Sequence, residues 1–306
     1  MSEIKTPDVK SRRFRMTDYA LIAMMILPFV VCILLKVLFT PAHEGVHIAG
    51  ALIYLEIPAP VQPLIISESQ VNSWGVIISI LGLCLYLTHG LTAKAVCKRQ
   101  LAAEWIVEKC QKLVDENMGD YFSTWAAFVA AILGLSALSS LSCLVGLFAP
   151  TGDVNVTAGW AILVFVLIMH YKFRGGFWNY FSGLFKPIPF FAPINLIGEF
   201  STPVSMAFRH YGNVLSGAVV SSLMAAALGG LSRTLLGWLP GILGDIPFLR
   251  IGIPAVLSIY FDVFSGCMQA FIFAMLTMMN VAGAVPWEEW NARKEKKRLR
   301  RSAAAG

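Results

Sequence analysis

The apolar stretch from Phe190 to Leu231 constrains the fold of this chain more than any other segment. It contains one basic residue, Arg209, close to its middle. A continuous helix of this length would measure about 60 Å, roughly twice the hydrocarbon thickness of a bilayer. Such a helix must tilt strongly or break, and Arg209 then lies near the membrane midplane. A guanidinium at that depth costs about 2.5 to 3.5 kcal/mol, so we expect it to be functional.

The composition indicates a protein with many membrane spans. Of the 306 residues, 57% are hydrophobic and 14% are charged, well below the roughly 25% charged residues of soluble domains. The net charge of +6 comes from the two ends, because residues 1–16 carry +3 and residues 287–306 carry +4. Basic ends favour an orientation with both termini on the cytoplasmic side and argue against a nucleic-acid-binding face.

The apolar runs predict an all-α polytopic membrane protein with about six transmembrane helices, of which the two C-terminal helices are long and strongly tilted. We divide the chain into a cytoplasmic basic tail (1–18), an N-terminal transmembrane helix (19–39), an extracytoplasmic loop (40–70), a membrane domain (71–285) and a second basic tail (286–306).

Residues 93–121 have a different pattern, in which apolar and charged residues alternate at helical intervals. This pattern predicts an amphipathic helix on the inner membrane surface, with Trp105 at the interface. No other segment offers a partner for its apolar face, which favours the membrane surface over a soluble insert.

The first apolar run, residues 19–39, follows five basic residues and has the flanks of a signal peptide. It is longer than a typical signal core, and the LFTPAHEG sequence at its end lacks a convincing small-residue cleavage site. We therefore prefer an uncleaved helix, and cleavage stays the alternative.

The outer loop contains the sequence His43-Glu44-Gly45-Val46-His47, which matches the H-E-x-x-H pattern of zinc proteases. In those enzymes a helix places both imidazoles on one face, and the glutamate acts as general base. Pro41 and Gly45 disfavour a helix here, and Glu56 follows a β-like run rather than a second helix. We interpret the motif as surface loop and predict no metal site, and a membrane zinc protease stays a remote alternative.

Polar residues recur at steps of three or four along both C-terminal helices, so most share one face of each helix. The first stripe contains Glu199, Thr202, Ser205, Arg209, Asn213 and Ser216, and the second contains Ser258, Asp262, Ser265, Gln269, Thr277 and Asn280. Two such helices side by side resemble the walls of an ion path.

Two alternatives to an ion path remain open. The first is a structural ion pair between Arg209 and Asp262, which is costly in lipid compared with apolar packing. The second is a secondary transporter with an arginine in its substrate site. Internal repeats would favour a transporter, and the sequence has none that we detect.

Four motifs together resemble subunit a of the bacterial rotary ATP synthase. They are PINLIGEFSTPVS, FRHYGNVLSG, the turn PTGDVNVT and SGCMQAFIFAMLTM. The similarity is strongest over residues 149–281, and the amphipathic helix is also in the expected place. The helix at 19–39 is additional to the five spans of many family members.

The resemblance implies a non-catalytic, ion-translocating stator subunit in the bacterial cell membrane. It would lie against a ring of c subunits, each with one membrane-embedded carboxylate, and two offset half-channels would reach that carboxylate from opposite sides. Its other partners would be subunit b of the peripheral stalk and membrane lipid. The transported ion would be H⁺ or Na⁺, with no cofactor, no nucleic acid and no catalytic residue.

Individual roles also come from the resemblance. Arg209 matches the essential arginine between the half-channels, and Gln269 matches the glutamine that faces it. Asn213 matches the asparagine one turn beyond the arginine. Asp153 and Asn155 match the polar turn at the outer entrance.

The chain departs from the family pattern at two positions. Many members have glutamate where this chain has Ala218, and histidine where this chain has Asp262. We expect Asp262 to be the ion-uptake group. Glu199 is a candidate for the exit path, with snorkelling or helix capping as the alternative. Ser205 and Ser265 complete the predicted ion path.

Overall fold

The computed structural model describes residues 16–40, 50–60, 63–91, 98–174, 176–185, 190, 192–236, 252, 256–257 and 259–288. Most of both basic tails, the HEGVH motif and Ser258 lie outside these residues. Six helices among them are long and apolar enough to cross a membrane. This confirms the all-α polytopic membrane fold predicted from the sequence.

The described helices are α1 (Met16–Phe39), α2 (Glu68–Thr88), α3 (Lys98–Met118), α4 (Ala126–Leu141), α5 (Val154–Arg174), α6 (Phe177–Leu184), α7 (Ala192–Leu236) and α10 (Gly266–Gly283). The 3₁₀ helices are η1 (Asp120–Trp125), η2 (Ser142–Val145) and η3 (Pro150–Gly152), and η5 (Ile259–Ser265) is a π-helix. The strands are β1 (Ile53–Ile57) and β2 (Leu64–Ser67).

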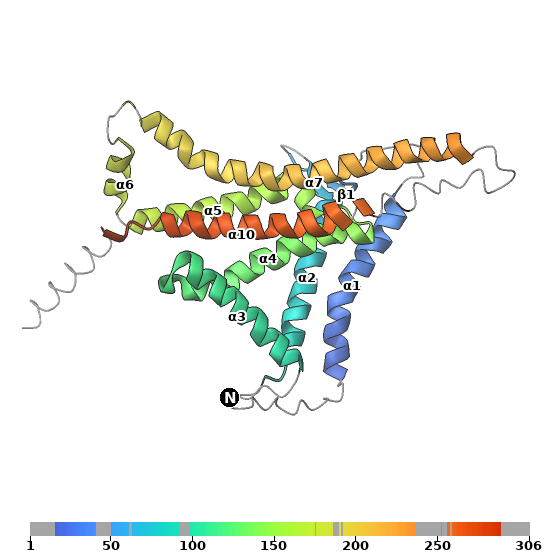
Figure 1. Ribbon diagram of the computed structural model, residues 1–306, viewed down its shortest axis with the longest axis horizontal. Coiled ribbons are helices and arrows are strands. Elements are labelled where there is room, and N and C mark those ends of the chain that lie inside the picture. Colours follow the sequence, from blue (N-terminus) through green and yellow to red (C-terminus); the bar gives the residue numbers. More distant parts are fainter. Residues whose placement is uncertain are drawn as a thin grey trace, which may run out of the picture.

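Helix α7 is a single helix of 45 residues, which corresponds to a length of about 68 Å. Figure 1 shows it along the long axis of the molecule, with α5 and α10 beneath it, while α1 and α2 descend steeply beside them. Pro203 lies inside α7 without ending it. The arginine segment therefore does not break, and its length requires a strong tilt in a bilayer.

The predicted outer loop at 40–70 contains a β-hairpin, of which the sequence indicated only the β-like run before Glu56. Strands β1 and β2 pair antiparallel, with Glu56 opposite Ile65. Both strands are rich in β-branched and aromatic residues, which favour extended backbone. Helix α2 then begins at Glu68, three residues before the predicted boundary of the membrane domain.

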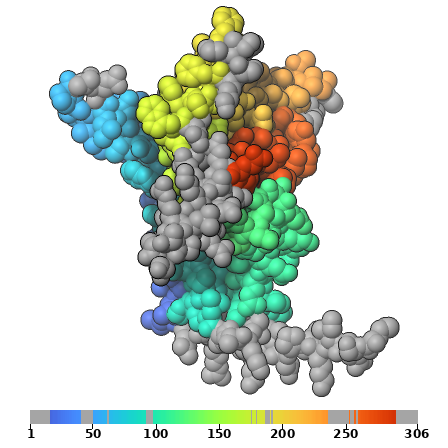
Figure 2. Space-filling view, turned by 90° about the vertical axis from the view of Figure 1, so that its left-hand side faces the viewer, coloured from blue at the N-terminus to red at the C-terminus, as the bar shows by residue number. Residues whose placement is uncertain are grey.

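The molecule has two chemically different ends. We call the end with the β-hairpin, Glu68 and Asp153 the hairpin end, and the end with Arg99, Lys172 and Arg174 the basic end. From the hairpin end, α1 leads down to the Arg99 part of the basic end, whereas α5 and α10 lead along the long axis toward Lys172 and Arg174 (Figure 1). Figure 2 looks at the α6 side of the molecule, where yellow-green residues around α6 lie above α10 (red) and α3 and α4 (green) lie below.

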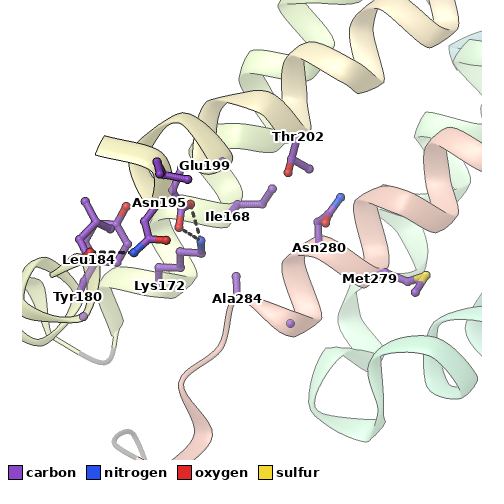
Figure 3. Close-up of a pocket in the computed structure, with 14 residues that line it drawn as sticks. Ile168, Lys172, Tyr180, Leu184, Asn195, Glu199, Thr202, Met279, Asn280 and Ala284 are labelled. Atoms are coloured by element: carbon purple, nitrogen blue, oxygen red, sulfur yellow. Dashed lines mark hydrogen bonds and ion pairs between the residues drawn. The ribbon is translucent and has the colours of Figure 1, made fainter. Parts of the chain in front are cut away.

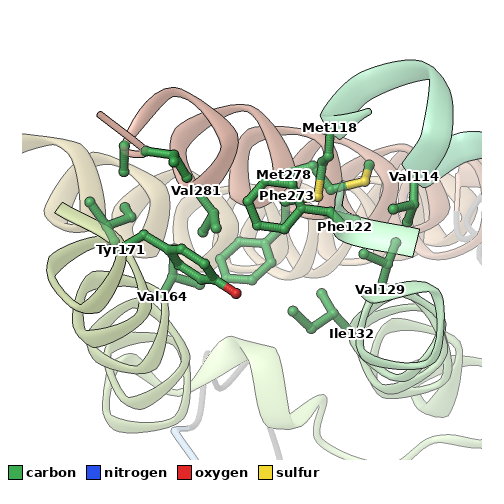
Figure 4. Packing of buried hydrophobic residues seen from close by; sticks show 14 of the residues in the cluster. Val114, Met118, Phe122, Val129, Ile132, Val164, Tyr171, Phe273, Met278 and Val281 are labelled. Atoms are coloured by element: carbon green, nitrogen blue, oxygen red, sulfur yellow. The ribbon is translucent and has the colours of Figure 1, made fainter. Parts of the chain in front are cut away.

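The main core joins α3, α4, α5, α7 and α10 (Figure 4). Phe122, Val164 and Phe273 are among its most buried side chains. Lipid tails are as apolar as these residues, so the core stabilises the fold mainly through close packing. Val114 and Met118 of α3 belong to this core. The expectation that α3 lacks a partner is therefore wrong for its C-terminal half, because α4 and α10 cover that face.

Helix α1 packs against α2 at two glycines. A Cβ atom on Gly82 would lie 3.0 Å from the backbone nitrogen of Met25, and one on Gly75 would lie 3.0 Å from the Cys32 sulfur. Small residues at these positions let the two backbones approach closely. At the basic end of this pair, Asp18 forms a buried ion pair with Arg99 at 2.9 Å.

Candidate functional site

Arg209 lies on an exposed face of α7, near the middle of that helix. Ser205 and Ser216 are exposed on the same face. Among the residues that the structure describes, Arg209 has neither a hydrogen bond nor an ion pair. A Cβ atom on Gly198 or Gly212 would meet no atom within 4 Å. The face around the guanidinium is therefore open and lined by small side chains.

The opposite edge of the predicted stripe contacts the last helix. The Ser265 hydroxyl donates to Asn213 Oδ1 at 2.8 Å, and the Asn213 amide nitrogen donates to the Ser265 carbonyl at 3.5 Å. At the other side of Arg209, Asn280 Nδ2 lies 3.7 Å from the Met206 sulfur. These contacts set the antiparallel register of α7 and α10. Gln269 of α10 is 7% exposed.

Asp262 lies in the π-helix η5, directly before α10. The α-helical spacing predicted from Asp262 to Gln269 does not hold over this segment, because the wider π turn changes the angle between Asp262 and Ser265. π turns occur frequently at functional sites. The neighbouring Phe261 packs at 3.3 Å from the Cβ position of Gly217. Asp262, which is half-buried, is therefore held close to the α7 turn that follows Asn213.

Asp153 lies at the hairpin end, between η3 and α5. One carboxylate oxygen accepts a hydrogen bond from the Ser69 hydroxyl at 2.5 Å, and the other accepts from the Asn155 backbone N–H at 2.9 Å. Asn155 is exposed, whereas Ser69 is fully buried. Asp153 and Asn155, the two residues predicted at the outer entrance, are thus hydrogen-bonded to each other. Ser69 of α2 is bonded to the same carboxylate.

Glu68 and Lys36 are residues at this end that the sequence analysis did not assign to a site. Glu68 is 2% exposed, and its carboxylate forms an ion pair with Lys36 of α1 at 2.9 Å. Burial raises the pKa of the nearby Tyr54 hydroxyl to about 12, and the negative charge of Glu68 acts in the same direction. The only sequence signal for Glu68 is an acidic residue at the start of an apolar span.

At the basic end, a cavity of about 670 Å³ lies between α5, α6, α7 and α10. Figure 3 shows Lys172 and Glu199 on one side, joined by an ion pair, and Thr202 and Asn280 farther in. The sequence offered an exit path, snorkelling or helix capping for Glu199. It did not predict the ion pair with Lys172. Burial raises the pKa of the Tyr180 hydroxyl beside the cavity, with the charge of Glu199 as the second cause.

A model of the ATP synthase A chain family matches residues 71–282, which is more than half of the chain. The matched segment includes the exposed arginine of α7 and the helix that pairs with it. The chain belongs to the ATP synthase A chain family.

Relatives of the chain include named members of this family. The sodium-ion-specific ATP synthase subunit a of Propionigenium modestum is 39% identical over 137 residues, covering 44% of this chain and 40% of that protein. ATP synthase subunit a of Priestia megaterium is 34% identical over 60% of this chain and 76% of its own length. The Legionella pneumophila subunit is 27% identical over 75% and 91% respectively.

His210, the neighbour of the family arginine, was not assigned a role from the sequence. It is fully buried, its Nε2 lies 3.1 Å from the Ser136 hydroxyl, and its ring contacts Trp160 and Phe273. The two adjacent residues therefore point in opposite directions, with His210 into the bundle and Arg209 outward. The sequence could have indicated this residue only through its position, as a polar residue directly after Arg209 in an apolar segment.

Two parts of the site lie outside the segment that the ATP synthase A chain model matches. These are helix α1, which supplies Lys36, and Glu68 at the start of α2. The ion pair between Lys36 and Glu68, and the bond from Phe148 to Glu68, therefore depend on residues that precede the matched segment. These contacts connect α1 to the segment that leads to Asp153.

Proposed function

We propose that this chain is the ion-translocating stator subunit of a rotary ATP synthase and that Arg209 faces the carboxylates of a c-ring. The observation that carries the proposal is the exposed position of Arg209 on an open face of α7, without an ion pair among the described residues. An intramembrane cation without a partner in its own chain is costly. A carboxylate on a neighbouring subunit would offset that cost.

The proposed mechanism is electrostatic. Burial in lipid keeps a ring carboxylate protonated, and a nearby fixed cation favours its charged form. A ring site that arrives at Arg209 therefore releases its proton, and it is protonated again after it moves away. Arginine suits this role because it stays charged at every relevant pH. Its charge also repels cations that would otherwise pass directly between the half-channels.

We assign the outer half-channel to the hairpin end. Asp153 and Asn155 form its entrance, and Asp262, Asn213 and Ser265 continue it toward the middle of α7. The hydrogen bonds between Ser69 and Asp153 and between Asn213 and Ser265 support this route, because polar groups recur along it.

We assign the inner half-channel to the basic end. Its support is the cavity of about 670 Å³, which Glu199, Thr202 and Asn280 line. Ser205 lies between this cavity and Arg209 along α7. We assign Gln269, which is buried on α10, to the route between this cavity and Arg209.

The orientation follows from charge. Arg99 lies beside the start of α1, and Lys172 and Arg174 lie in the last turn of α5. Basic residues at helix ends favour the cytoplasmic side of a membrane. We therefore propose that both termini are cytoplasmic in the bacterial cell membrane. The c-ring and subunit b of the peripheral stalk are the proposed partners, and nucleotide chemistry takes place elsewhere in the complex.

The proposed ion is H⁺, with Na⁺ as the second candidate. The Propionigenium modestum relative, 39% identical over 137 residues, is named sodium-ion-specific, which supports testing both. ATP synthesis in vesicles with an imposed pH difference and no sodium distinguishes the two.

The experiment that tests the function is Arg209→Lys in the assembled complex. We expect ion-driven ATP synthesis to be abolished while the complex still purifies intact, because a lysine near the midplane loses its charge more readily. Arg233→Lys is the matched control, since Arg233 is exposed in the last turn of the same helix. Normal coupled synthesis by the Arg209→Lys complex would refute the proposal.

A further inference from the structure

The first turns of α2 hold the backbone of Phe148 from both sides. The Phe148 N–H donates to Glu68 Oε1 at 3.1 Å, and the Asn72 amide nitrogen donates to the Phe148 carbonyl at 2.9 Å. Both polar backbone groups of one residue are thus satisfied by buried side chains of another helix. Buried backbone groups are costly to leave unpaired, so these two bonds set where residue 148 lies.

The segment that begins at Phe148 continues to Asp153 and contacts α7. The Phe148 ring lies 3.4 Å from the Cβ position of Gly152, and Val214 of α7 lies 3.3 Å from that same position. Val214 is the neighbour of Asn213, which binds Ser265. The position of residue 148 therefore affects both Asp153 and the α7 turn beyond the arginine.

Lys36 makes this arrangement compatible with a buried carboxylate. Glu68 is 2% exposed, and Lys36 is its ion-pair partner at 2.9 Å. The other titratable groups that act on or beside Glu68 are Tyr54 of β1 and Cys32 of α1. Neither of these carries a positive charge. The cation from α1 thus lies beside the same carboxylate that accepts the hydrogen bond from the Phe148 N–H.

We propose that Glu68, paired with Lys36 of the additional helix α1, is a positioning residue of the outer half-channel that holds the Phe148–Asp153 segment in place. The proposal rests on the proposed function. Glu68 acts through the Phe148 backbone and does not itself carry the ion. Helix α1 then contributes to the geometry of the ion path through Lys36. Cleavage after residue 39 would remove this contribution.

The test compares two double variants in vesicles that contain the whole ATP synthase. Lys36→Met with Glu68→Gln removes the charges and keeps a side-chain acceptor for Phe148. Lys36→Met with Glu68→Leu removes the charges and the acceptor. The measurement is the rate of ATP synthesis against ion concentration in the compartment at the hairpin end. The control is Asp18→Asn with Arg99→Met, which removes the other buried ion pair of α1.

We expect the leucine variant to need about tenfold more ion for half-maximal synthesis, at an unchanged maximal rate, which corresponds to the loss of about one hydrogen bond. The glutamine variant and the Asp18/Arg99 control should keep the wild-type half-maximal concentration. A merely structural role would lower the maximal rate through loss of complex and leave the half-maximal concentration unchanged. That result overturns the proposal, as does an equal shift in the two Glu68 variants.

Asn72→Ala keeps the test decisive if the leucine variant fails to accumulate. It removes the bond to the Phe148 carbonyl and leaves the Lys36–Glu68 pair intact, so it should raise the half-maximal ion concentration in the same direction. An unchanged value overturns the proposal. If the wild-type vesicles show no ion-dependent synthesis, the proposed function itself fails, and the two failures are thereby distinguished.

Discussion

The hairpin end and the basic end differ in the burial and the hydrogen bonding of their polar side chains. At the hairpin end, Glu68, Ser69 and Asn72 are buried and bonded to specific partners on α1 and on the segment before α5. At the basic end, Glu199 and Lys172 pair with each other beside a cavity of about 670 Å³.

Under the proposed function, this difference corresponds to two ways of moving an ion. In a region where polar side chains are bonded to one another, we expect a titratable group to carry the ion from step to step. A roomy polar cavity can hold water, so no single side chain is indispensable. Substitutions should therefore have larger effects toward the hairpin end than toward the basic end.

Among the substitutions that compare the two ends, Asp262→Asn should have the largest effect. Loss of a proton-transfer group typically slows a reaction by roughly 100-fold or more, and we expect ion-driven synthesis to slow to that extent. Glu199→Gln, beside the cavity, should slow it by less than about tenfold, because water there can substitute for the carboxylate. The measurement is ATP synthesis in vesicles at several outside pH values. Equal losses in the two variants would break the comparison between the ends.

Packing gives a second, intermediate effect. A Cβ atom on Gly266, at the start of α10, would lie 2.6 Å from the Ser140 Cβ atom. Gly266→Ala should therefore destabilise the fold by about 1 to 3 kcal/mol through overpacking. Gly283→Ala is the control at the other end of α10, because a Cβ atom there meets nothing within 4 Å.

The apparent melting temperature of the purified complex measures this effect. Ser140→Gly combined with Gly266→Ala should recover most of the loss, because it removes the colliding atom. Equal melting temperatures for the two alanine variants would mean that the hairpin end is no more tightly packed than the basic end.

The smallest expected effect is that of Lys172→Met. Its side chain is 25% exposed and that of Glu199 is 17% exposed, next to a cavity. Solvent screening limits such a pair to roughly 1 kcal/mol or less. Lys36→Met should cost about 3 to 5 kcal/mol, because it leaves the buried Glu68 without its cation. The amount of folded chain in membranes tests this order, and a larger loss for Lys172→Met would contradict it.

Much of the fold could be predicted from local patterns. Apolar runs identified the membrane-spanning helices, and the length of the arginine segment required either a tilt or a break. In the structure this segment is the unbroken helix α7, which requires a tilt. Hydropathy works here because a lipid-exposed backbone must satisfy its own hydrogen bonds, which leaves a helix as the only form for each span.

The partners within the site could be predicted less well. The polar stripe around Arg209 followed from helical spacing, but the pairing of Glu199 with Lys172 and the π-helix at Asp262 did not. Spacing gives the face on which a residue lies, whereas the partner of that face depends on how distant helices pack.

The sequence alone determined the family motifs, the number of spans and the arginine at the middle of the longest helix. Only the tertiary structure decided that Arg209 points outward while His210 points inward, and that Lys36 of α1 reaches Glu68. The physical reason is that lipid drives each apolar segment into the membrane independently. The choice of neighbours then depends on close packing and on polar contacts between residues far apart in the chain.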